Sequence, residues 1–285
     1  MNTFAKRSPA PLLALIVLLA SFSAGQAINN PEELVSAAIR NQIADTSQPQ
    51  LFAWKERKHR GARIETQSVV ETPDGTLSRV TLIDNRPLTP EQRAAEEQRV
   101  RRMSDPAQMR RARKDREEDD ERTRHLLATI PDAFHFTVLS TSTAENGHRL
   151  VRMAFTPRPD FRPPNREAAV FTGMRGEMVV DEAAKRLVRI DGTLFKDVNF
   201  GWGILGKLYS GGRFLIEQQE VTPTHWEATR SVLHFDGKAL FIKPIHVDED
   251  EFAWDFKQVP PMSVAQAVRY LASSSQSQPS ASLAP

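Results

Sequence analysis

The sequence predicts a mainly antiparallel β protein of the α+β class, in which helices cover one curved sheet or incomplete barrel. Apolar and polar residues alternate along most of the chain after Leu51, which is the period of strands with one buried face. After Pro131 the connections between the expected strands are short and no helical pattern separates them. This spacing favours a meander over parallel βαβ units. One helical insertion, residues 87–130, interrupts the strands.

The N-terminal segment is typical of a secretory signal peptide. Two basic residues precede an apolar run over residues 12–20, and small residues follow up to Ala27. The run is shorter than the roughly 20 apolar residues that a membrane span needs. We therefore expect residues 1–27 to be removed and the mature chain to start at Ile28. The protein is then periplasmic or secreted, and it is not a transmembrane protein.

The rest of the chain predicts a single β-rich domain, residues 28–271, and a Ser/Gln/Pro-rich tail, residues 272–285, that we expect to be disordered. The absence of cysteine excludes disulfides, thiol catalysis and thiolate metal sites. The two basic residues of the signal peptide account for the whole net charge of +2. The mature chain therefore has no charge excess that would favour nucleic acid.

Capping residues mark the helices. Asn30 before Pro31 predicts a helix over residues 31–44. In the insertion, Thr89-Pro90-x-Gln92 and Asp105-Pro106-x-Gln108 each place a hydrogen-bond acceptor before a proline that opens a helix.

The insertion is rich in charges of both signs. Glu118 with Arg122, and Asp120 with Arg124, have the favourable acid-first spacing of four residues. Two interpretations remain open: a protruding arm that binds an envelope protein through residues 89–128, or a solvated pair of salt-bridged helices.

Turn signals predict two short hairpins near the C-terminus. Loops at residues 236–238 and 248–250 would place Ile242 opposite both Val232 and Phe256. Large side chains would then share one face of the sheet: Val232, Leu240, Ile242, Trp254 and Phe256.

Aromatic residues on the expected strands predict an apolar binding face. We expect the following residues to bind ligand: Phe52, Trp54, Trp226, Phe252, Trp254 and Phe256. Because the mouth of a barrel is a common site for apolar molecules, the expected partner is an apolar ligand, a lipid or a lipoprotein. The alternative is a closed core. A glycine-framed loop carrying Trp202, Leu205 and Tyr209 predicts either a flap over the cavity or a loop packed on the core.

The sequence predicts no catalytic residue, no metal and no cofactor. Gly201-x-Gly203-x-x-Gly206 matches a dinucleotide fingerprint, but no helix opens at these glycines. In the expected register, His234 and His246 lie roughly 20 Å apart, too far to share an ion. No nucleophile elbow, zinc-protease motif or P-loop is present. We expect a non-enzymatic protein, and a hydrolase with dispersed catalytic residues is the least favoured alternative.

The order of elements resembles the periplasmic lipoprotein-carrier superfamily, which includes LolA/LolB-like and RseB-like proteins. The features in common are a signal peptide, a helix at 31–44, an aromatic strand at Phe52-x-Trp54, a helical interruption and a long meander, together covering most of residues 30–260. The resemblance implies an incomplete antiparallel barrel whose concave face holds acyl chains beneath helical lids. The second function left open is an envelope scaffold that uses the charged insertion.

Overall fold

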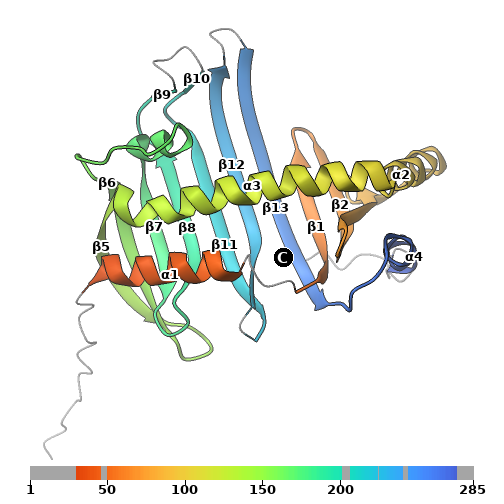
Figure 1. Ribbon diagram of the computed structural model, residues 1–285, viewed down its shortest axis with the longest axis horizontal. Coiled ribbons are helices and arrows are strands. Elements are labelled where there is room, and N and C mark those ends of the chain that lie inside the picture. The colour runs from red at the N-terminus through yellow and green to blue at the C-terminus, as the bar shows by residue number, and fades with distance from the viewer. Residues whose placement is uncertain (1–29, 46–49, 201–205, 224, 240–242, 275–285) are drawn as a thin grey trace, which may run out of the picture.

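The computed structural model describes residues 30–45, 50–200, 206–223, 225–239 and 243–274 (Figure 1). The predicted signal peptide and residues 275–285 of the predicted tail lie outside the described residues. The helices are α1 (Pro31–Asp45), α2 (Pro90–Met103), α3 (Pro106–Ala133) and α4 (Val264–Ser274), with a short 3-10 helix, η1 (Glu167–Gly173). The first eight strands are β1 (Phe52–Arg60), β2 (Arg63–Thr72), β3 (Gly75–Ile83), β4 (Arg86–Pro87), β5 (Phe134–Thr143), β6 (Arg149–Pro157), β7 (Met174–Asp181) and β8 (Arg186–Leu194). The others are β9 (Val198–Phe200), β10 (Gly206–Leu208), β11 (Arg213–Thr222), β12 (His225–Ala239) and β13 (Lys243–Gln258).

The predicted fold class is confirmed: the strands form one large antiparallel sheet that does not close, with a few helices. Their spatial order is β4-β3-β2-β1-β13-β12-β11-β8-β7-β6-β5, and β9 and β10 are attached beside β12. Two meanders are therefore joined where β1 pairs with β13. The order ends at β4 on one side and at β5 on the other.

Helix α3 carries the chain from one side of this sheet to the other. Nine steps along the strand order separate β3 from β5, which at about 4.8 Å per step is about 43 Å. The helix has 28 residues, and at 1.5 Å per residue it is about 42 Å long. Its length matches the width of the sheet, and it lies across the strands on the same face as α1 (Figure 1).

The C-terminal part of α3 and the whole of α1 cover an apolar core on β5 to β8, called the aromatic core below. Helix α1 begins as predicted, because the Asn30 side chain accepts the Glu33 N–H at 3.0 Å. Phe134 meets Phe155 and Phe171 edge to face, with ring centroids 5.0 and 5.4 Å apart. Other buried members of the aromatic core are Leu34, Val35, Ile39, Ile130, Phe136, Val151, Met153 and Val180.

A second, smaller cluster holds the N-terminal end of α3. Met109 is buried against Val70 and Leu77 of the β2–β3 hairpin and against Leu271 of α4. Gly75 lies in the left-handed region at φ 135°, and a Cβ there would lie 3.3 Å from the methyl group of Met109. Glycine at position 75 therefore suits both the positive φ of the turn and the close approach of the Met109 side chain.

Between these two anchors, α3 crosses the sheet with residues 110–123 exposed. The insertion is therefore not a free protruding arm: it is anchored at both ends, and the stretch between the anchors is solvated and salt-bridged, as the second interpretation expects. The predicted ion pairs are also wrong, because Arg122 pairs with Asp119 and Arg124 with Glu121, each three residues away. Residues three apart are neighbours on a helix as well, and Glu118 is already paired with Lys114 at 3.9 Å.

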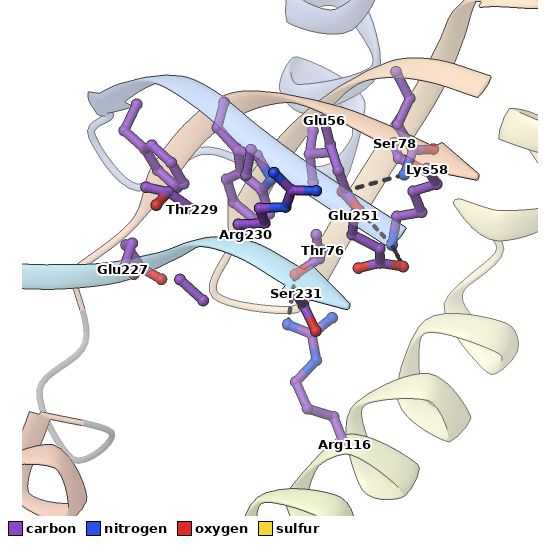
Figure 2. Close-up of a pocket in the computed structure, with 16 residues that line it drawn as sticks. Glu56, Lys58, Thr76, Ser78, Arg116, Glu227, Thr229, Arg230, Ser231 and Glu251 are labelled. Carbon is purple, nitrogen blue, oxygen red and sulfur yellow. Dashed lines mark hydrogen bonds and ion pairs between the residues drawn. The ribbon is translucent and has the colours of Figure 1, made fainter. Parts of the chain in front are cut away.

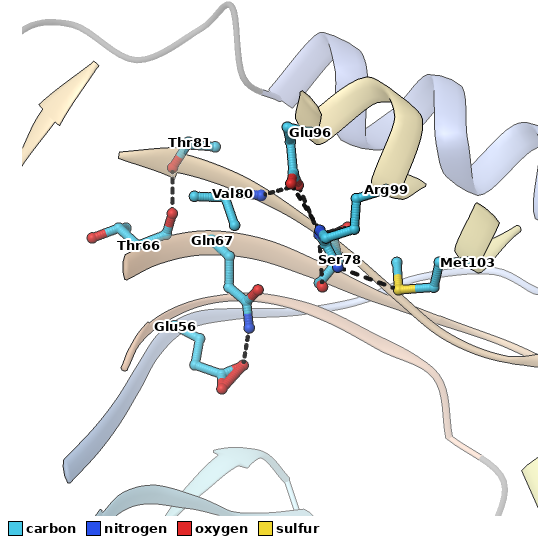
Figure 3. Close-up of polar contacts among 9 residues, drawn as sticks. All are labelled: Glu56, Thr66, Gln67, Ser78, Val80, Thr81, Glu96, Arg99 and Met103. Carbon is cyan, nitrogen blue, oxygen red and sulfur yellow. Dashed lines mark hydrogen bonds and ion pairs between the residues drawn. The ribbon is translucent and has the colours of Figure 1, made fainter. Parts of the chain in front are cut away.

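Helix α2 covers the edge of β3 beyond the short strand β4. Both predicted caps form, at Thr89 and Asp105. The Glu96 carboxylate accepts the Val80 N–H at 2.7 Å, and Arg99 donates to the Ser78 carbonyl at 2.8 Å (Figure 3). These two side chains use hydrogen-bonding groups that a further strand would otherwise use. The edge is thereby protected from pairing with another chain.

Strands β12 and β13 form one long hairpin, so the two short hairpins predicted from turn signals are wrong. Val232 pairs with Asp250 and Leu233 with Glu249, and the pairing continues through residues 236–238, where a turn was expected, to Ala239 opposite Lys243. Leu240 and Ile242, which were expected on the shared face, lie outside the described residues.

Gly237, which predicted a turn in this hairpin, is explained by the packing of β10 against β12. A Cβ on Gly237 would collide with the Lys207 carbonyl oxygen, so glycine permits strand contact here and makes no turn. The acidic run remains extended because its side chains have partners across the hairpin: Asp248 pairs with His234 at 2.7 Å and Asp250 with Arg230 at 3.4 Å.

Within the described part of the chain, no helix combines the length and apolar character needed to cross a membrane.

Candidate functional site

A groove of about 450 Å³ lies beneath the exposed middle of α3, on the helix-covered face of the sheet (Figure 2). Its walls come from β1, β2, β3, β12 and β13, and Arg116 reaches it from α3. Strands far apart in the sequence meet here because β1 pairs with β13.

The apolar part of the groove is an aromatic wall. Trp54 and Phe256 stack with ring centroids 5.8 Å apart and an interplanar angle of 16°. A β-bulge in β13 brings the two rings together. Asp255 takes a positive φ of 59°, and the register between β1 and β13 shifts at this point. The extra residue returns Phe256 to the face that carries Ala253, and Val69 of β2 continues the apolar surface.

The polar part of the groove consists of paired charges. Lys58 of β1 forms ion pairs with Glu56 on its own strand and with Glu251 of β13, the latter at 3.0 Å (Figure 2). Glu56 is 7% exposed and also accepts a hydrogen bond from Gln67 at 3.3 Å. Both carboxylates are therefore compensated within the groove wall, which the buried Glu56 in particular requires.

A cluster of titratable groups lies beside the aromatic wall. Glu71 accepts the Phe52 N–H at 3.0 Å, and the Phe52 ring stacks on His225 at 4.6 Å. His225 in turn contacts the Glu227 carboxylate at 2.8 Å. Burial raises the pKa of Glu71 and the negative Glu227 adds to the rise, while the Phe52 N–H and the positive charge of Arg116 oppose it.

Arg116 connects the groove to α3. Its guanidinium donates to the Thr76 hydroxyl of β3 at 2.5 Å. The exposed stretch of the helix thus has a polar contact with the sheet in addition to its two apolar anchors. Figure 2 shows the side chain extending from α3 toward β3 and β12.

The six aromatic residues predicted from the sequence do not gather in one place. Trp54 and Phe256 line the groove, whereas Phe52, 1% exposed, is buried beside it. Trp226 is half-buried and does not line the groove.

Phe252 and Trp254 stack on each other at 5.5 Å on the other face of the sheet. Trp254 pairs with Lys55, while the neighbouring pair of Glu56 and Ala253 faces the groove. Adjacent residues of a strand point to opposite faces. The expectation that Trp254 and Phe256 share a face is therefore wrong.

Two of the three predicted flap residues, Trp202 and Leu205, lie outside the described residues. Tyr209 directly follows β10, is 38% exposed, and has the Lys207 ammonium 5.6 Å from its ring centroid.

Sequence reasoning missed the charged groove residues. Glu56 and Lys58 follow Trp54 at alternate positions of one strand, which is the signal that they share its face. Their partner Glu251 is nearly two hundred residues away, so no local pattern indicates it.

The histidines do not gather around an ion. In the observed register His246 lies opposite Asp236, and Asp236 is two residues from His234 along β12. The two histidines are therefore closer together than the predicted register placed them. Each histidine pairs with an aspartate at 2.7 Å. In the described part of the chain, no three metal-ligating side chains come together.

Comparisons with known proteins give little further information. No protein-family model matches the chain, and no curated protein matches it. Among solved structures, the chain is similar to the crystal structure of a DUF1329 family protein from Desulfovibrio piger ATCC 29098. The sequences are 10% identical, the alignment covers 84% of this chain and 98% of that chain, and the TM-score is 0.26.

Proposed function

We propose that this protein is an exported, non-enzymatic binding protein that holds an apolar ligand, a lipid or the lipid part of a lipoprotein in the groove beneath α3. The observation that carries the proposal is the stacked pair of Trp54 and Phe256, half-buried in an open groove instead of a filled core. A concave site with an apolar wall and a few fixed polar groups is typical of small-molecule binding.

The groove favours an amphiphile over a pure hydrocarbon. An acyl chain would lie along Trp54, Val69 and Phe256, where it removes apolar surface from water. The ion pairs of Lys58 would lie beside its polar end. Helix α3 would act as the cover, since it spans the groove between two apolar anchors.

Export is part of the proposal. The basic, apolar and small-residue pattern of the first 27 residues supports cleavage before Ile28 and a periplasmic or secreted location. The order of elements, which resembles periplasmic lipoprotein carriers, supports the same class of function.

The test compares two tryptophans that lie on opposite faces of the sheet, Trp54 in the groove and Trp254 on the other face. The mature chain is titrated with cis-parinaric acid, an intrinsically fluorescent fatty acid. We expect Trp54→Glu to weaken binding at least about tenfold, the equivalent of 1.4 kcal/mol. The matched control Trp254→Glu, on the other face, leaves binding unchanged. No binding by the natural chain, or an equal loss in both variants, contradicts the proposal. Native mass spectrometry of protein from an envelope fraction then identifies the natural ligand.

A scaffold role is the second candidate, and the exposed residues 110–123 of α3 favour it. An envelope protein that is crosslinked through this stretch in cells, while the groove is empty in native mass spectra, would support the scaffold over the carrier.

A further inference from the structure

The junction between α2 and α3 is strongly basic. We call residues 101–114 the basic elbow. Its cationic side chains are Arg101, Arg102, Arg110, Arg111, Arg113 and Lys114, and its one acidic residue is Asp105. Asp105 caps α3, accepting the Ala107 and Gln108 N–H groups at 2.9 and 3.1 Å. The carboxylate of Asp105 is thus engaged by the first N–H groups of α3 and forms, within the described part of the chain, no ion pair with the basic side chains of the elbow.

Three of these six cationic side chains have no ion-pair partner within the described residues, and the other three have only long ion pairs. Within the described residues, Arg102, Arg110 and Arg111 have no carboxylate at ion-pair distance. The ion pairs of the other three cations are long, at 3.7 to 3.9 Å, and exposed. Exposed pairs of this kind contribute little. The elbow therefore presents a positive surface that the protein itself compensates only in part.

The position of the elbow and the residues around it suit contact with anionic groups. It lies at the right-hand end of the molecule in Figure 1, at one end of the longest axis. A cavity of about 760 Å³ opens there, lined in part by Arg99, Arg101, Arg102 and Gln108. Guanidinium groups around a cavity can each donate two hydrogen bonds to a phosphate.

The elbow has no exposed apolar anchor. Met109 is buried, Val100 is 1% exposed, and Met103 packs against the smaller apolar cluster. The exposed large apolar side chains in the described part of the chain, Val138, Leu139, Phe195 and Tyr209, lie elsewhere. The core of a protein–protein interface is enriched in aromatic and apolar residues. Attraction to an anionic bilayer, in contrast, needs only clustered Lys and Arg.

We propose that the basic elbow docks on the surface of an anionic phospholipid bilayer, with lipid phosphates contacting Arg102, Arg110 and Arg111. This surface lies outside the groove, so the proposal does not rest on the proposed ligand. If both hold, docking would bring one end of α3, and with it one end of the groove cover, to the membrane.

Vesicle flotation tests the proposal. The mature chain is mixed with vesicles of phosphatidylglycerol and phosphatidylcholine in equal parts, or of phosphatidylcholine alone. We expect binding to the anionic vesicles only, and we expect it to weaken as salt rises above about 0.1 M, since the screening length there is about 10 Å.

The variant Arg110→Gln/Arg111→Gln locates the binding surface. Each basic residue near an anionic surface contributes roughly a factor of five to affinity, so the double variant should bind roughly 25-fold more weakly. Both positions are exposed, and glutamine is a good helix former, so circular dichroism should be unchanged. The control Arg213→Gln/Lys243→Gln removes the same charge from exposed positions on β11 and β13 and should bind as the natural chain does.

Four results would overturn the proposal. Two concern the natural chain: failure to float with anionic vesicles, and equal binding to both kinds of vesicle. Two concern the variants: binding by the elbow variant as strong as that of the natural chain, and a loss of binding in the control variant as large as that in the elbow variant.

Discussion

The helix-covered face of the sheet has a filled half and an open half, although one helix spans both. Over β5 to β8, alternate positions carry residues such as Phe136, Met153 and Phe155, and the helices close on them. Over β1 to β3, the corresponding face carries Glu56, Lys58 and Gln67, and α3 leaves a groove. Helix α1 covers only the filled half, and the open half carries charged and polar side chains where the filled half carries aromatic ones. Both differences leave the second half as a groove instead of a core.

The open half depends on the anchors at its borders. Met109 fixes one end of α3 and Ile130 the other, while the stretch between them is exposed. A helix held at both ends can span a groove without filling it. The same geometry separates the residues that stabilise the fold from those available to a ligand.

The largest expected effect compares one aromatic residue from each half. Phe155→Ala should lower the free energy of unfolding by about 3 to 5 kcal/mol, because the ring is fully buried. Trp54→Ala should cost about 1 kcal/mol, since its ring lies in an open groove. Urea unfolding of both variants measures the difference. Equal losses would mean that the groove is part of the core and that the two halves do not differ.

The anchor at Met109 should show the next largest effect. Met109→Ala removes a buried side chain and should cost about 2 kcal/mol or more in urea unfolding. The neighbouring control, Arg110→Ala, is exposed and should stay within about 0.5 kcal/mol of the natural chain. If both variants are equally stable, the end of α3 is not anchored there.

The difference between the halves also shows what the sequence can predict. Helix starts are local, so Asn30, Thr89 and Asp105 identify them correctly. Strand pairing is not local: neither β1 nor β13 carries a signal for the other, and the bulge at Asp255 is equally silent.

The candidate site follows the same rule. The aromatic residues predicted a binding face on several strands, and two of them, Trp54 and Phe256, line the groove. The face that each side chain occupies depends on strand register, and the register expected from the turn signals was wrong. Gly237 predicted a turn and instead permits contact with β10. The bulge at Asp255 then places Phe256 beside Trp54 in the groove, while Phe252 and Trp254 stack on the other face of the sheet.

A smaller effect is expected at the edge that borders the open half. Glu96→Gln keeps an oxygen that can accept the Val80 N–H but removes the charge that pairs with Arg99. A hydrogen bond to a charged group contributes about 1.5 to 3 kcal/mol, and we expect a loss near the lower value. The control Glu97→Gln affects only an exposed pair 3.9 Å long, so thermal melting should barely change. An equal shift in the two variants would show that the edge contact is not stabilising.

The smallest expected effect concerns pH and belongs to the open half alone. Burial raises the pKa of Glu71, assisted by Glu227, above the ordinary value of 4.5. The folded state therefore holds a proton that the unfolded state has already released. Consequently, stability falls as pH rises from about 4.5 through the raised pKa, and it is constant above that.

Glu71→Gln keeps an acceptor for the Phe52 N–H but cannot ionise. We expect it to be more stable than the natural chain at neutral pH and to equal it below about pH 4. Urea unfolding across this range measures the slope, with the exposed Glu145→Gln as control. Parallel curves for the natural chain and Glu71→Gln would show that this carboxylate is as well solvated as one at the surface and that burial does not raise its pKa.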